Sequence, residues 1–304
     1  MNKVNPKEKI KLKFSLLASG IFVLLALIFG LITNSSSILF DGVYSLISFS
    51  MALLTLKIAM LLERPNDETF HFGYAAVEPT LNLFKSLIII ATCVYAVFGA
   101  INQLLSGGSE ARYGLAIMYG LTSTLGCFIV YLYLMHTNKE HHTDLIRVDA
   151  KAWFVDSVLS AAILIGFVSA WILENNQKSD LAKIIDPVVL IILGTAALIV
   201  PAKLLLESLR EVILKAPKSE IVDNIERVLA DSLSSVPFDS LQVRVSKLGR
   251  EIYLLAHIIV AENFEISSIN DLDMIRRKAH KDLMNTYPLI VVDLIFIRDS
   301  EFAT

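Results

Sequence analysis

Two aspartates interrupt long apolar stretches of this 304-residue chain, where a carboxylate is costly. Asp41 lies in LFDGVYSLIS and Asp156 in KAWFVDSVLSAAILIGF. An ionisable side chain at the middle of a bilayer costs at least about 2.5–3.5 kcal/mol, so such residues usually face a cavity or one another. Ser45 follows Asp41 by four residues, and Ser160 follows Asp156 by four, so each pair of oxygens shares a helical face. If the two faces meet, they form an oxygen-lined, cation-attracting chamber. Otherwise the acids are only hydrogen-bond partners between helices.

A third polar stripe precedes another apolar run. Glu78, Asn82 and Lys85 recur at i, i+4 and i+7, and Asp149 stands seven residues before Asp156 on the same helical face. Lys85 needs an acidic partner, and Glu78, Asp41 and Asp156 are the candidates. Because Glu78 and Asp149 lie near the ends of apolar runs, each is interpreted either as a solvated charge or as part of a gate to the chamber.

The elements that must position these residues are membrane-spanning helices. The chain is 55% hydrophobic and 19% charged, whereas soluble domains carry about 25% charged residues. A bilayer core requires about 20 mostly apolar residues per helix, and six stretches meet that requirement: 14–33, 38–62, 80–104, 113–135, 149–173 and 186–206.

The charges indicate how the helices are oriented. Lysine and arginine are concentrated before the first span, between spans four and five, and after span six, so both termini are predicted to be cytoplasmic. The default location is the inner (plasma) membrane of a bacterium. A net charge of −3 gives no reason to expect a nucleic-acid partner.

The pattern changes near residue 210. Ile221, Ile225, Val228 and Leu229 follow a helical period, and 240–249 alternates apolar and polar residues as a half-buried strand does. A second strand, a helix beginning near Ser268 or Asn270, and a third strand follow. We therefore expect two domains: an all-α transmembrane bundle over 1–209, and a cytoplasmic α+β domain over 210–304 with the ferredoxin-like order α-β-β-α-β.

Together these segments resemble the cation diffusion facilitator family over nearly the whole chain. The matching pieces are SSSILFDGVYSLIS, FHFGYAAVEP, VDAKAWFVDSVLSAAILIG and DPVVLIILGTAALIVPAKLLLESLREVILKAPKSE, in that order. The resemblance implies a homodimer that exports divalent cations, commonly in exchange for protons.

The family's transport site uses two ligands four residues apart in span two and two more in span five. The corresponding positions are Asp41 and Ser45, then Ala152 and Asp156. The resemblance therefore implies one carboxylate per span, a hydroxyl from Ser45 and no imidazole. Zinc prefers nitrogen and sulfur ligands, so this oxygen-only set favours harder ions such as Mn²⁺, Fe²⁺ or Mg²⁺ over tight zinc binding.

The resemblance also suggests a second, weaker metal site. His257 and Asp299 stand at positions where family members bind zinc in the cytoplasmic domain, but Ile297 occupies a position where histidine is expected. His71, with acidic neighbours, lies in a loop that binds a bridging metal in some members. We expect that the domain dimerises by packing, and that no cofactor is tightly bound.

The sequence also bears on two other classes of function. An enzyme is not expected, because the sequence contains no nucleophile–base pair, glycine-rich phosphate loop or zinc-hydrolase helix. A non-transporting paralogue that acts as a partner subunit or a membrane scaffold remains the alternative. Apart from another copy of itself, membrane lipid is the only expected partner.

Overall fold

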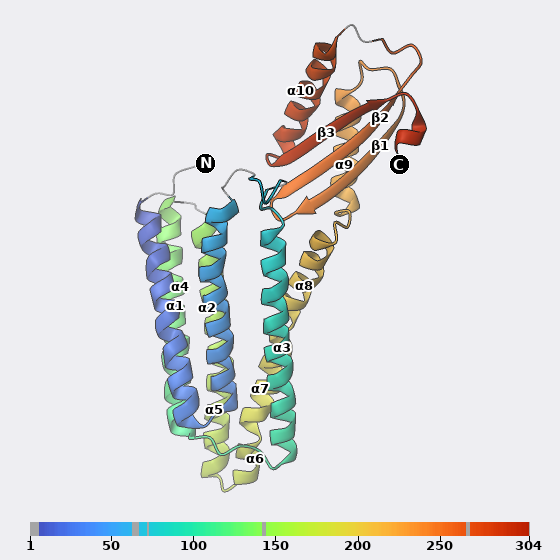
Figure 1. Cartoon of the computed structure of the whole chain (residues 1–304). Coiled ribbons are helices and arrows are strands. Elements are labelled where there is room, and N and C mark those ends of the chain that lie inside the picture. Colours follow the sequence, from blue (N-terminus) through green and yellow to red (C-terminus); the bar gives the residue numbers. More distant parts are fainter. Residues whose placement is uncertain (1–5, 63–66, 72, 142–143, 266–267, 304) are drawn as a thin grey trace. The chain divides into compact units, whose positions relative to one another are not determined.

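A computed structural model describes residues 6–62, 67–71, 73–141, 144–265 and 268–303 (Figure 1). Its contacts divide the chain into two compact units. The first joins Met1–Leu54 to Lys85–Ala202, and the second joins Thr55–Phe84 to Lys203–Thr304. The domain boundary expected after residue 209 falls within a helix, α8 (Ile199–Val212), and stays a prediction.

Within the described ranges, six helical segments are long and apolar enough to cross a membrane, which confirms the six expected spans. Five are single helices and the sixth is made of three in succession. Their bounds are α1 Pro6–Thr33, α2 Ser36–Leu62, α3 Val77–Leu105, α4 Tyr113–His141, α5 Asp144–Asn175, α6 Ser179–Lys183, α7 Ile185–Ala197 and α8 Ile199–Val212. The chain is therefore a multi-pass membrane protein.

The sixth span is interrupted at Leu198. The backbone N–H of Leu198 donates to the carbonyl of Thr195, three residues earlier, at 3.2 Å. Pro201 follows and has no N–H with which to bond the carbonyl of Ala197. The missing hydrogen bond explains why one apolar run forms two successive helices, α7 and α8.

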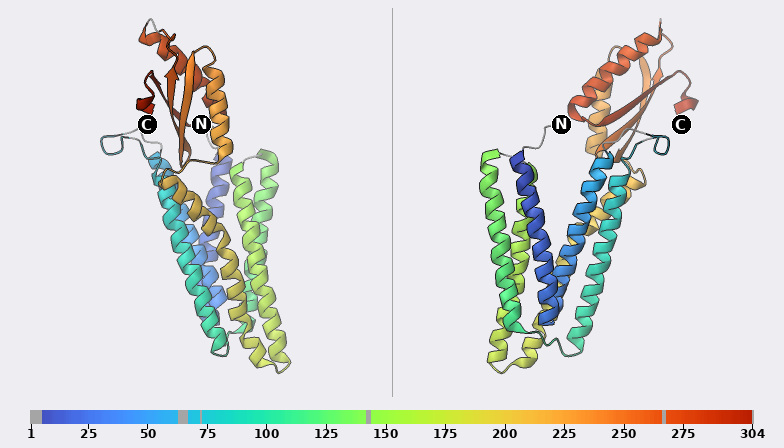
Figure 2. Two further views of the ribbon diagram at one scale, coloured as in Figure 1. Left: turned by 90° about the vertical axis from the view of Figure 1, so that its right-hand side faces the viewer. Right: turned by 60° about the vertical axis from the view of Figure 1, so that its left-hand side comes forward.

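Glycine allows α1 and α2 to approach closely near the end where the two helices are joined (Figure 2). A Cβ atom on Gly30 would lie 2.7 Å from the Cα of Leu39, and one on Gly42 would lie 2.9 Å from the backbone nitrogen of Leu27. Because both obstacles are backbone atoms, a side chain at either position would push the helices apart. Gly42 is the residue after Asp41, so this contact fixes where Asp41 lies against α1.

We expect Gly30→Ala to lower the free energy of unfolding by about 1–3 kcal/mol, as overpacking does elsewhere. The control is Gly99→Ala in α3, where a Cβ would meet nothing within 4 Å. Thermal denaturation in detergent measures both variants. Equal denaturation midpoints for the two would show that the close approach of α1 and α2 contributes nothing.

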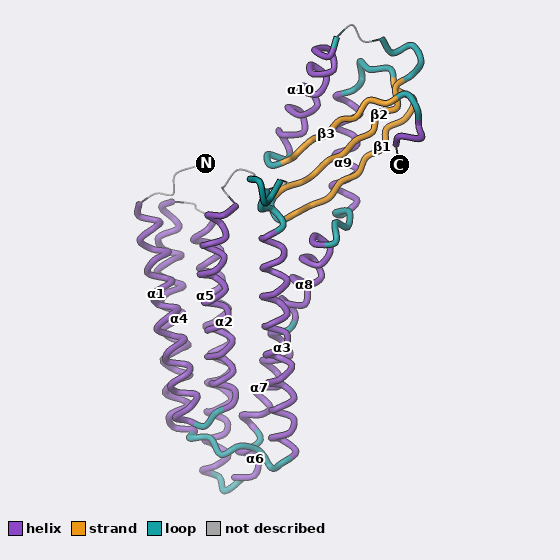
Figure 3. The backbone as a smooth tube through the Cα atoms, in the orientation of Figure 1, coloured by secondary structure: helices purple, strands orange, loops and turns teal. Residues whose placement is uncertain are grey.

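The C-terminal part of the second unit is an α+β fold. It contains α9 (Ser219–Ser232), β1 (Phe238–Leu248), β2 (Glu251–Val260), α10 (Ile269–Thr286), β3 (Ile290–Ile297) and the short 3₁₀ helix η1 (Ser300–Ala303). The strands lie side by side in the order β1-β2-β3 (Figure 3). β1 and β2 pair antiparallel through a turn at Gly249, while β2 and β3 pair parallel, with α10 as the crossover. The expected order α-β-β-α-β is confirmed.

One face of this sheet packs on both helices. Ile225 and Leu229 of α9, Leu254 and Ile258 of β2, and Leu283 of α10 are almost fully buried in one cluster. The apolar face predicted for α9 is therefore its core face. Ser268 is the N-cap of α10, and its N–H donates to the Asp271 carboxylate at 2.9 Å, as expected of a helix cap.

Candidate functional site

Asp41 is held by a residue that the sequence did not single out. Tyr119 of α4 is 3% exposed, and its hydroxyl donates a hydrogen bond of 2.5 Å to Oδ2 of Asp41. The Asp41 side chain is half-buried. α4 therefore approaches the candidate chamber beside α2 and α5.

Asp156 of α5 lies near enough to Asp41 for the two charges to interact. Tyr44, three residues after Asp41, lies in the same region as Asp156. Asp156 is exposed in the single chain, and no hydrogen bond joins the two carboxylates among the described residues. The structure thus brings the two acids into one region of the bundle.

The serines of the two stripes differ in their surroundings. Ser160 is 3% exposed and shares a 2.8 Å hydrogen bond with Ser123 of α4, so it joins two helices. Ser45 is half-buried and, within the described part of the chain, makes no hydrogen bond through its hydroxyl. Ser45 is therefore the serine whose oxygen is available to a ligand. Ala152, at the fourth expected position, has no ligand atom in its side chain.

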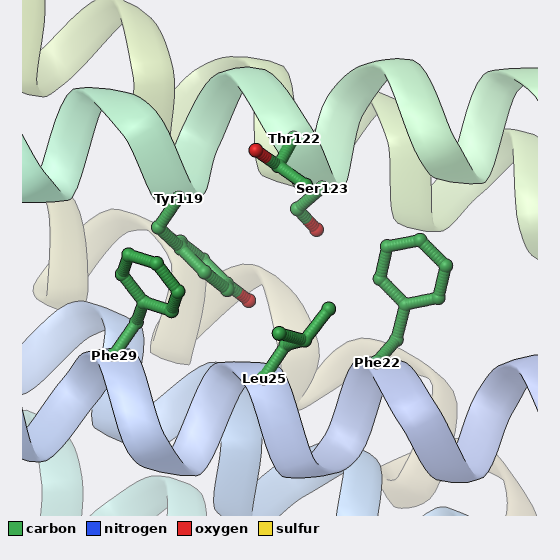
Figure 4. A pocket seen from close by; sticks show the side chains of 6 residues that line it. All are labelled: Phe22, Leu25, Phe29, Tyr119, Thr122 and Ser123. Atoms are coloured by element: carbon green, nitrogen blue, oxygen red, sulfur yellow. The ribbon is translucent and has the colours of Figure 1, made fainter.

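A small pocket lies between α1 and α4, beside the Tyr119–Asp41 bond (Figure 4). It has room for about one water molecule. This pocket is thus too small for a hydrated cation and forms a largely apolar wall of the site. Its lining residues are Phe22, Leu25, Phe29, Tyr119, Thr122 and Ser123.

The three polar residues Glu78, Asn82 and Lys85 do not share one set of contacts. Glu78 forms an ion pair with Arg250 of the β1–β2 turn, with Oε2 and Nε 3.3 Å apart. Asn82 and Lys85 are half-buried. No ion pair among the described residues includes Lys85, so neither Asp41 nor Asp156 is the partner expected for it.

Asp149 lies in a polar contact between α1 and α5. Trp153 Nε1 donates to Ser15 Oγ at 2.8 Å, and Ser15 in turn hydrogen-bonds the Asp149 carboxylate. The Oδ2 atom of Asp149 is buried and has no hydrogen-bond partner within the described ranges. An unpaired carboxylate oxygen on the face that carries Asp156 is compatible with a gate.

The residues of the weaker metal site have separate structural roles. Asp299 Oδ1 accepts the Glu301 N–H at 2.9 Å and thereby caps η1. His257 is 6% exposed in the central strand, and its Nδ1 has no hydrogen-bond partner in the described part of the chain. His71 is exposed, with Nε2 3.0 Å from the Glu68 carbonyl oxygen. Across the described residues, no group of three or more His, Cys, Asp or Glu side chains could hold a metal ion. The Asp41–Asp156 pair falls below that number because it has only two such residues.

Asp186, at the start of α7, is a second residue that the sequence did not single out. It is 1% exposed, and its carboxylate accepts hydrogen bonds from Ser35, which precedes α2, from the first turn of α2 and from the loop before α4. The donors are Ser35 Oγ at 2.9 Å, Ser36 N at 2.8 Å, Ser37 N at 3.1 Å, Ser37 Oγ at 2.5 Å and Ser109 Oγ at 3.1 Å. Asp186 therefore accepts hydrogen bonds from free backbone N–H groups at the N-terminus of the helix that carries Asp41, and its negative charge is favourable at that helix end.

Comparison with known proteins identifies a matching family and several relatives. A family described as the cation efflux transmembrane domain matches residues 12–213. The chain is 24% identical to the manganese efflux system protein MneP of Bacillus subtilis over 226 residues, which are 73% of this chain and 75% of that protein.

Magnetosome proteins are also similar. Identity to MamM of Paramagnetospirillum magneticum is 24% over 200 residues, 66% of this chain and 62% of that protein. Identity to MamB of Magnetospirillum gryphiswaldense is 23% over 146 residues, 47% of this chain and 48% of that protein. The chain thus spans less than two thirds of the length of these two relatives.

Proposed function

This chain belongs to the cation diffusion facilitator family of metal-cation efflux transporters, and we propose that it exports a divalent cation in exchange for protons by alternating access. The observation that carries the proposal is the approach of Asp41 on α2 to Asp156 on α5. Two carboxylates from different membrane helices, with the free hydroxyl of Ser45, offer oxygen atoms only. Such a site suits Mn²⁺, Fe²⁺ or Mg²⁺ better than it suits tight binding of Zn²⁺. The relative MneP is named a manganese efflux system protein, which supports the same class of ion.

Proton exchange follows from the chemistry of the ligands. Two carboxylates close together in a medium of low dielectric resist being ionised at the same time. Metal and protons compete for the same oxygens, so a cation that binds Asp41 and Asp156 displaces protons, and protons from the other side displace the cation. Asp149, Glu78, Asn82 and Lys85 are the proposed gate residues along this route.

The assembly and its location are also proposals. The distribution of lysine and arginine favours cytoplasmic termini in the inner (plasma) membrane, so the cation would leave the cytoplasm. Family membership favours a homodimer. His71, His257 and Asp299 hold no cation in this proposal.

Purified protein in liposomes that enclose a pH-sensitive dye tests the proposed function. We expect that an inward or outward gradient of Mn²⁺ drives protons in the opposite direction, and that Zn²⁺ does so less effectively at equal concentration. Protein-free liposomes are the control. Cation movement without proton movement would exclude antiport, and the absence of any cation movement would favour the non-transporting alternative.

A further inference from the structure

The Tyr119–Asp41 hydrogen bond is fixed by its surroundings. The Tyr119 ring is buried in an apolar wall, with its centroid 5.8 Å from that of Phe29 on α1. Phe22 and Leu25 continue the same wall (Figure 4). A buried ring enclosed in this way keeps its hydroxyl directed at one acceptor, Oδ2 of Asp41.

Close helix packing fixes both partners of the bond. A Cβ on Gly120, next to Tyr119, would lie 2.9 Å from the Cα of Leu164, so α4 lies directly against α5. The Ser123–Ser160 hydrogen bond of 2.8 Å joins the same two helices one turn further along. Asp41 is placed equally closely, because Gly42 brings α2 against the backbone of α1. Donor and acceptor thus belong to helices that have little freedom to separate locally.

The bond makes the two oxygens of Asp41 unequal as ligands, because only Oδ2 accepts the Tyr119 hydroxyl. A carboxylate can bind a cation through one oxygen or through both. Because Oδ2 shares its electron density with the Tyr119 hydroxyl, Oδ1 is the Asp41 oxygen that is more open to an ion. Ca²⁺ takes six to eight oxygen ligands and often binds both oxygens of a carboxylate, whereas Mg²⁺ and similarly small ions keep six ligands in an octahedron.

We propose that Tyr119 is a specificity-determining residue that restricts Asp41 to one-oxygen coordination and thereby disfavours large divalent cations such as Ca²⁺ relative to Mn²⁺. This inference rests on the proposed function, in which Asp41 binds the transported cation. It adds a residue from α4 to a site built otherwise from α2 and α5, and it assigns that residue to ion choice.

Binding of Mn²⁺ and Ca²⁺ to the purified full chain in detergent, measured by calorimetry, tests the inference. In Tyr119→Phe both oxygens of Asp41 become available, so the ratio of the Ca²⁺ Kd to the Mn²⁺ Kd should fall about tenfold, the lower end of the effects of residues that orient metal ligands. Tyr133→Phe is the matched control, because Tyr133 is an exposed tyrosine on the same helix. Its ratio should equal that of the wild type.

A second variant, Tyr119→Leu, also lacks the donor and should shift the ratio in the same direction, which keeps the test valid if one variant folds poorly. An unchanged ratio, or an equal loss of affinity for both ions, would overturn the role of Tyr119 while leaving the cation site in place. If the wild type binds neither ion, or if Asp41→Asn binds Mn²⁺ as well as the wild type does, the proposed site fails and this inference fails with it.

Discussion

Alanine at Asp41 or at Asp156 should abolish cation-driven proton movement in liposomes. Each substitution removes one of two carboxylates from a site that has no imidazole or thiolate to replace it. Loss of residues that merely orient metal ligands costs 10–100-fold in affinity, so loss of a ligand should reduce transport by at least about 100-fold. Proton flux driven by a Mn²⁺ gradient, at equal amounts of reconstituted protein, measures the effect.

Asp180→Ala is the control for both variants. Asp180 is an exposed acid on α6, in the same unit of the chain, and takes no part in the proposed site. This control should transport at the wild-type rate. If either site variant kept half of the wild-type flux, its carboxylate would have no place in the mechanism.

The largest effect on stability is expected at Asp186. Replacement by asparagine removes the charge and one acceptor oxygen while five donors still point at the position. Leaving buried donors without their acceptor, or removing one member of a buried charged network, lowers the free energy of unfolding by about 3–5 kcal/mol. Asp186→Asn should therefore lower the midpoint of denaturation in detergent strongly, or prevent accumulation of folded protein.

Two further measurements separate this stability effect from a transport effect. Asp180→Asn makes the same chemical change at an exposed site and should leave the midpoint unchanged. The folded fraction of Asp186→Asn should still bind Mn²⁺, because Asp186 makes hydrogen bonds between helices and is not a ligand of the cation in the proposed site. A wild-type midpoint for Asp186→Asn would show that the start of α2 needs no carboxylate.

Local patterns predicted most of the fold. Runs of apolar residues determine membrane spans, and the alternation around Val243 and Val245 determines a strand, because both depend on neighbouring residues alone. The interruption at Leu198 was missed although Pro201 signals it, since an apolar run conceals a missing hydrogen bond.

The candidate site could be predicted only in part. Asp41 and Asp156 are conspicuous because charge is costly in a bilayer. Tyr119 is not, because tyrosine is unremarkable in a membrane helix and its reach to Asp41 depends on the rotation of α4, which no single span specifies. A polar pair at Tyr119 and Ser123, four residues apart in an apolar run, was the only available signal.

Helix α2 begins at Ser36, within a run of three serines. The acceptor of the hydrogen bonds from these serines, Asp186, stands 149 residues after Ser37, so no local pattern connects the two.

For Lys85, a local pattern predicted an ion pair that the structure does not contain among the residues it describes. Glu78 was an expected ion-pair partner of Lys85, because the two lie on one face of α3. Glu78 is instead paired with Arg250 of the β1–β2 turn, which is far away in sequence.

The central claim is that one cation lies between Asp41 and Asp156. Calorimetric binding of Mn²⁺ to the wild type, Asp41→Asn, Asp156→Asn and the double variant tests it most directly, because ligands of a single ion are coupled and independent sites are additive. We predict one Mn²⁺ per chain, at least about tenfold weaker binding in each single variant, and no further weakening in the double variant beyond the more severe single one. Two ions per chain in the wild type, or losses that multiply in the double variant, would contradict the account.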